Sequence, residues 1–72
     1  MTTRMWEARA ADGKLDALVS WVLANAPDDS DIYSSADDRV VVIDGSGRAM
    51  PEPPTDLVAR PPHSWDFEPV RR

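Results

Sequence analysis

The sequence predicts a small α+β domain in which one main helix covers one face of a small antiparallel sheet. Three observations indicate this class: four β-branched apolar residues at 40–43, one amphipathic helical pattern at 14–26, and alternating segments at 3–10 and 64–70. With 72 residues the chain forms one domain at most, and a chain of that size buries only about 60% of its unfolded surface. We therefore expect a single domain with a marginal core.

Residues 40–43, Val-Val-Val-Ile, predict the central strand. β-branched side chains favour an extended backbone, and four in a row place apolar groups on both faces of the sheet. A strand with one face in water would alternate with polar residues, so this strand needs a neighbour on each side and cover on both faces. One helix covers one face, which leaves the other face for a partner chain or a ligand.

Residues 3–10 alternate with the period of two that is typical of a strand. Trp6 and Ala8 share one face, where the small alanine lets a helix approach closely. Glu7 and Arg9 share the opposite face. There they form either a solvated ion pair, which contributes about 0–1 kcal/mol, or part of a polar pocket or interface.

The helix predicted over 14–26 has clear start and stop signals. Asp12 is expected to cap it, because its carboxylate can accept hydrogen bonds from the amides of the first turn. Leu18 and Val22 follow the spacing of an apolar helix face. Pro27 ends the helix, since proline disfavours the helical conformation of the residue before it.

A hairpin is predicted over 31–44, because a short strand at 32–35 is separated from the central strand by only a few residues. The acidic segment Asp-Asp-Ser-Asp at 28–31 lacks the spacing of a calcium-binding loop. The segment Gly-Ser-Gly at 45–47 lacks the Lys-Ser or Lys-Thr of a phosphate-binding loop. We therefore predict turns here rather than a metal or nucleotide site.

The segment 48–62 is rich in proline and predicts an irregular strap, whose fixed φ angles lower the entropy cost of ordering it. Alternation over 64–70 predicts a closing strand on an edge of the sheet, where Pro69 is tolerated. Trp65 and Phe67 share one face of this strand. Two aromatic residues so near the end indicate that the tail docks on the core or on another subunit.

Charge and composition restrict the partners. A net charge of −5 argues against general affinity for nucleic acid or for an anionic membrane. The absence of cysteine excludes thiol catalysis and thiolate metal sites.

The sequence contains neither an apolar run of signal-peptide length nor the ~20 apolar residues that span a bilayer, so we expect a cytoplasmic protein. Its preference for Arg over Lys is typical of a GC-rich genome, and we expect a bacterial one.

No arrangement of residues predicts a catalytic residue, a cofactor or a bound metal. His63 is the only histidine and follows two prolines, where a histidine is more often a loop residue than a base or a ligand. The candidate ligand-binding residues that remain are the polar and aromatic ones on or near the predicted sheet: Glu7, Arg9, Tyr33, His63 and Trp65.

Three tryptophans are many for this length: Trp6, Trp21 and Trp65. Core packing is the first explanation for them. A dimer interface and an aromatic ligand pocket are the other two.

The element order strand, helix, hairpin, connection, strand is that of a ferredoxin-like fold, with the Pro-rich strap in place of the second helix. In the segments 4–9 (Arg-Met-Trp-Glu-Ala-Arg), 15–26 and 32–44, the chain resembles a shortened member of the dimeric α+β barrel proteins related to antibiotic-biosynthesis monooxygenases. The resemblance implies a homodimer whose two sheets pack face to face. Some members oxidise aromatic polyketides without metal or flavin, in a cavity of which the second helix forms one wall. That helix is missing here, and no catalytic position matches.

Two functions stay open. We expect a small non-enzymatic accessory or interaction protein that acts as a homodimer or binds a protein partner. The alternative is a minimal cofactor-independent monooxygenase-like enzyme or a binder of a small aromatic ligand. An apolar cavity lined by tryptophan would favour the alternative, and a filled core would favour the interaction protein.

Overall fold

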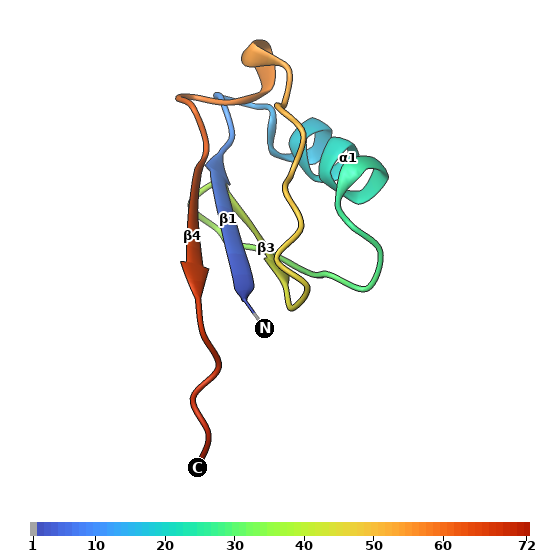
Figure 1. Cartoon of the computed structure of the whole chain (residues 1–72). Helices are drawn as coiled ribbons and strands as arrows, with labels where there is room; N and C mark the ends of the chain where they lie inside the picture. The colour runs from blue at the N-terminus through green and yellow to red at the C-terminus, as the bar shows by residue number, and fades with distance from the viewer. Residues whose placement is uncertain (1) are drawn as a thin grey trace.

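The computed structural model describes residues 2–72. The elements follow in the order β1 (Thr3–Arg9), α1 (Leu15–Asn25), β2 (Asp31–Ser34), β3 (Arg39–Asp44), a short 3₁₀ turn η1 (Thr55–Leu57) and β4 (His63–Phe67). The strands form one antiparallel sheet in the order β2-β3-β1-β4 (Figure 1). The predicted α+β class is confirmed, and the order of strands corresponds to a ferredoxin-like sheet with a single helix.

The core lies between α1 and one face of the sheet. In β3 the burial alternates, so that Val40 and Val42 are fully buried beneath the helix while Val41 and Ile43 lie on the opposite face. From β1, the buried Ala8 presents a small side chain on the helix side, as the sequence pattern predicts. The core is completed by side chains of β1 and α1, namely Trp6, Ala10, Leu18 and Val22.

The strap between β3 and β4 covers the same side of the sheet as α1 (Figure 1). Its residue Pro53 is buried, and Met50, Leu57 and Val58 pack against the core. Backbone bonds join it to the end of β1, because the Ala59 amide donates to the Arg9 carbonyl at 2.9 Å. The strap therefore occupies the place of a second helix and leaves the other face of the sheet uncovered by helix or strap.

The start of α1 differs from the prediction. The N-cap residue is Lys14, which makes no side-chain capping bond, rather than Asp12. Gly13 adopts a φ of 72°, and the Lys14 amide donates to the Ala11 carbonyl at 2.9 Å. A tight turn therefore separates Asp12 from the helix. At the other end the helix stops before Pro27, as predicted, with Ala26 already extended.

The last strand also differs from the predicted range of 64–70. It begins at His63 and ends at Phe67, which pairs with Thr3, the first residue of β1. Just beyond that pair the Thr2 hydroxyl still donates to Glu68 Oε1 at 2.9 Å, but Pro69 has no amide to continue the ladder. The Arg4 Nε atom donates to Asp66 Oδ1 at 3.1 Å and holds β4 to β1. The chain after β4 then runs away from the sheet (Figure 1).

No helix among residues 2–72 has the length and apolar character needed to cross a membrane.

Candidate functional site

The side of the sheet opposite α1, here called the open face, brings the five candidate residues onto one surface. Directly opposed residues of an antiparallel pair point to the same side. Glu7 pairs with His63 on one side and with Val41 on the other, and Val41 pairs with Tyr33. The same rule assigns these residues to the open face: Thr3, Met5, Glu7, Arg9, Asp31, Tyr33, Arg39, Val41, Ile43, His63, Trp65 and Phe67.

The centre of the open face is apolar and accessible. Trp65, Met5 and Ile43 form one row across three strands. The large side chains are far from buried: Tyr33 is 57% exposed, Trp65 43% and Phe67 51%. A soluble monomer seldom leaves several large apolar groups together at its surface, and such patches mark interaction sites.

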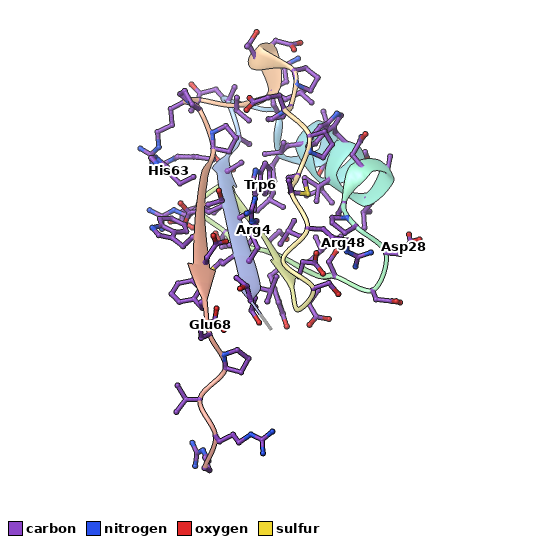
Figure 2. The ribbon with its side chains drawn as sticks, in the orientation of Figure 1. Arg4, Trp6, Asp28, Arg48, His63 and Glu68 are labelled. Atoms are coloured by element: carbon purple, nitrogen blue, oxygen red, sulfur yellow. The ribbon has the colours of Figure 1, made fainter. Side chains whose placement is uncertain are left out.

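His63 extends this apolar surface along β4. Its ring stacks on that of Trp65, with centroids 5.9 Å apart and planes 23° from parallel. Figure 2 shows His63 projecting from β4 on the side away from α1. His63 therefore extends the aromatic surface of Trp65 at the β4 edge of the open face.

One end of the open face carries two arginines. Arg9 and Arg39 are direct partners in the register of β1 and β3, so two cations lie side by side. The Arg39 Nη1 atom lies 3.6 Å from Glu7 Oε2, and its Nε atom lies 3.5 Å from Asp37 Oδ2. That Nε atom is buried and makes no hydrogen bond. Two carboxylates thus offset the like-charge pair without fully satisfying the guanidinium.

Asp37 takes part in this cluster mainly through its neighbour Ser35. A hydrogen bond from the Ser35 hydroxyl lowers the pKa of Asp37, with smaller contributions from the charges of Arg39 and Arg9. Asp37 and Arg39 were missed from the sequence because their proximity depends on the tight turn between β2 and β3. The signal that would have found Arg39 is its place opposite Arg9 in a β1–β3 pairing.

A shallow hollow of about 240 Å³ lies beside this cluster. Glu7 and Tyr33 line it together with Ser34, Ser35, Asp37, Arg39 and Val41. His63 and Trp65 lie on the far side of β1, and Arg9 does not line the hollow. The five candidate residues share one face, but they do not converge on this hollow.

A second hollow, of about 230 Å³, lies along the strap. Its lining is mostly proline and small residues: Glu52, Pro53, Thr55, Val58, Ala59, Arg60, Pro61 and Pro62. No tryptophan lines either of these two hollows.

Side chains fill the space between α1 and the sheet. Trp6 is 5% exposed, and its ring centroid lies 6.4 Å from that of Trp21 (Figure 2 labels Trp6 between sheet and helix). Leu18 and Val22 are completely buried on the other side of this layer. Two of the three tryptophans thus contribute to the core, and Trp65 lies on the open face.

A buried ionic clasp between Asp44 and Arg48, which the sequence patterns do not predict, closes the end of β3. Asp44 is only 3% exposed and accepts hydrogen bonds from the backbone amides of Ser46 at 3.1 Å and Arg48 at 2.8 Å. The Arg48 Nε atom donates to the same carboxylate at 3.1 Å. These bonds, that of the Arg48 side chain foremost, lower the pKa of Asp44 to about 2.

The clasp fixes a neighbouring loop. The Arg48 Nη2 atom donates to the backbone carbonyl of Asp28, and the two residues lie close together in Figure 2. Arg48 thereby joins the turn after β3 to the acidic loop between α1 and β2. The signal for this contact is the Asp-Gly-Ser-Gly-Arg segment at 44–48, in which an aspartate side chain can bond amides a few residues later.

Within residues 2–72, no group of three or more acidic or histidine side chains is placed to hold a metal ion. The geometry instead describes an accessible aromatic surface with a polar cluster at one end. Comparisons with models of known protein families, with curated proteins and with solved structures found no match to this chain.

Proposed function

We propose that the protein is a small non-enzymatic interaction protein that forms a homodimer through its open face. The half-exposed aromatic side chains of Tyr33, Trp65 and Phe67 carry this proposal. α1 and the strap both lie on the opposite face of the sheet, so within residues 2–72 neither of them covers the second apolar face of β3, where Val41 and Ile43 are half-buried. A second copy would supply that cover.

The area of the face supports a reversible dimer rather than a permanent one. Four strands about 4.8 Å apart, each about five residues long at about 3.4 Å per residue, define a face on the order of 300–400 Å². The aromatic side chains, with about 150–250 Å² each, raise the area buried between two copies toward the low end of specific interfaces, about 1,200 Å². We expect dissociation at about micromolar concentration.

The resemblance to dimeric α+β barrel proteins supports the same arrangement, because their two sheets pack face to face. The filled space between α1 and the sheet supports a non-enzymatic role, since a monooxygenase-like site would need a cavity there. A net charge of −5 supports a protein partner over nucleic acid or an anionic membrane. The lack of cysteine fits a reducing cytosol, where we propose that it acts.

Light scattering across a dilution series tests the proposal. The mass of the wild-type protein should fall from that of two chains to that of one chain as the concentration drops through the micromolar range. The double variant Trp65→Ser/Phe67→Ser should stay a monomer throughout, because it removes two exposed aromatic groups from the open face.

The matched control is Leu23→Ser, which removes an exposed apolar side chain from α1, away from the open face. This variant should dimerise like the wild type. A wild-type protein that is monomeric at all concentrations, or a dimer that the double variant leaves intact, would exclude the open face as the interface.

A further inference from the structure

The two ends of the open face carry different charges. At one end lie Arg9 and Arg39, the arginine end. At the other end β2 begins at Asp31, which pairs with Ile43, four residues along β3 from Arg39. Asp28 and Asp29 precede it in the loop from α1, where Asp28 lies beside Arg48 (Figure 2), and of the three only Asp31 lies in a strand on the open face. We call these three carboxylates the acidic corner. At about 3.4 Å per residue, the two ends lie on the order of 14 Å apart.

Each end retains charged side chains that form no ion pair among residues 2–72. The cation next to the acidic corner is Arg48, and its guanidinium is engaged by Asp44 and by the backbone carbonyl of Asp28. At the arginine end, Glu7 and Asp37 lie near the Arg39 guanidinium, whose Nε atom is buried. Arg9 is exposed and forms no ion pair within residues 2–72, so its donor hydrogens can bind a further carboxylate.

Two-fold symmetry limits the ways in which two open faces can pack against each other. In a dimer with one self-complementary interface, the same face is used by both copies. For aligned sheets, the axis lies in the interface and runs either along the strands or across them. An axis along the strands exchanges β1 with β3, so Arg9 of each copy would lie on Arg39 of the partner subunit. Like charges brought together across an interface are unfavourable.

An axis across the strands has the opposite effect. It lays β3 on β3 with the direction reversed, so the Arg39 end of one copy lies over the Asp44 end of the other, beside the acidic corner. With Arg39 over the partner's Asp31, the axis passes through the row of Tyr33, Glu7 and His63. β4 then lies on β4 with His63 at the axis, and the exposed Trp65 of each copy lies toward the arginine end of the other. We infer that two copies pack with reversed strands, the arginine end of each against the acidic corner of the other. This inference rests on the proposed homodimer.

Complementary charge reversal tests this orientation. Asp31→Arg alone and Arg39→Glu alone should each weaken self-association at least about tenfold, because two symmetry-related attractive contacts become repulsive. An equimolar mixture should form heterodimers with near wild-type affinity. In the mixed dimer one contact is the native pair and the other is the same pair with its charges exchanged. Native mass spectrometry distinguishes the two variants by mass and counts each species.

The controls are Asp56→Arg and Arg60→Glu, which make the same charge changes at exposed positions on the strap. They should dimerise like the wild type, both alone and mixed. Circular dichroism checks that Arg39→Glu folds, since this residue lies near Glu7 and Asp37. If Arg39→Glu does not fold, the self-association of Asp31→Arg alone, compared with that of Asp56→Arg, tests the orientation. Added salt should weaken the wild-type dimer and strengthen the Asp31→Arg dimer.

The outcomes separate the inference from the proposal beneath it. A wild-type monomer would overturn both. A wild-type dimer with mixed variants that fail to recombine, or with Asp31→Arg no weaker than Asp56→Arg, would overturn the reversed orientation and leave the homodimer in place. Recovery in the mixture, absent from the strap controls, is the result we expect.

Discussion

Gly47 allows the strap to pass close to the backbone just before β1. A Cβ atom at this position would lie 2.9 Å from the carbonyl oxygen of Thr2, closer than real Cβ contacts. Its φ of 68° is also a conformation that other residues seldom adopt. Nearby, Gly45 meets nothing within 4 Å, and its φ is not positive.

We predict that Gly47→Ala lowers the free energy of unfolding by about 1–3 kcal/mol, through backbone strain and the clash with Thr2. Gly45→Ala should change it by less than about 1 kcal/mol, or stabilise the fold slightly, because it restricts the unfolded chain without a clash. Urea unfolding of the two variants measures both. Equal losses of unfolding free energy in the two variants would show that the close approach of the strap to Thr2 does not affect stability.

Asp44 makes stability depend on pH. Its pKa falls from an ordinary 3.8 to about 2 in the folded protein, through the bonds from Arg48 and Ser46. The folded state therefore holds the ionised carboxylate more strongly than the unfolded state does. This contribution is fully present above pH 3.8 and is lost as the pH falls through about 2.

We predict that Asp44→Asn melts at a lower temperature than the wild type at pH 7, and that the difference shrinks between about pH 4 and pH 2. The measurement is the melting temperature across that range. Asp56→Asn, at an exposed position on η1, serves as the control and should follow the wild type. The pKa of Asp37 is also lowered, so this residue contributes a slope of the same sign that all three proteins share. A constant difference between wild type and Asp44→Asn would contradict the role of the clasp.

At the scale of elements, α1 depends on the side chains that face the sheet. Leu18 is completely buried, whereas Leu23 on the same helix is 65% exposed. Burial of one helical face, rather than intrinsic helix propensity, supplies most of the stability of a helix of 11 residues.

We predict that Leu18→Ala costs about 2–5 kcal/mol, from lost burial and the cavity it leaves. A chain of this size has a total stability of only about 4–11 kcal/mol at about 0.05–0.15 kcal/mol per residue, so part of the population should unfold at room temperature. Leu23→Ala, the same substitution at an exposed site, should change stability by about 0.5 kcal/mol or less. Circular dichroism in urea compares them, and similar losses would place the helix in a different rotation.

At the scale of the whole molecule, residues 2–72 cover one face of the sheet with α1 and the strap and leave the other face open. A small domain has a large surface for its volume. In this chain the helix and the strap both pack on the same side of the sheet. The proposed homodimer would cover the other side without adding residues to the chain.

We therefore predict that the melting temperature falls when the wild-type protein is diluted. A partner that binds only the folded state stabilises it by about 2.7 kcal/mol at 100 times its dissociation constant, and by little once diluted below that constant. The Trp65→Ser/Phe67→Ser variant should melt at the same temperature at every concentration. Scanning calorimetry over a wide range of concentration measures this. A wild-type melting temperature that does not move would argue for a monomer.

The sequence alone determined the elements whose signals are local. Four β-branched residues at 40–43 predicted a central strand, and the apolar spacing with Pro27 predicted the helix and its end. These features depend on contacts within a turn of helix or on the alternation of one strand, so neighbouring residues carry the information. The α+β class follows from them directly.

Tertiary structure decided everything that depends on which segments meet. The register of β1 with β3 places Arg39 beside Arg9, and the pairing with β4 ends the last strand at Phe67. Packing on the core placed the strap on the same side as α1. That choice left the face of Tyr33, Trp65 and Phe67 open. Contacts between distant residues depend on the whole set of apolar surfaces competing for burial, and no local pattern records the outcome of that competition.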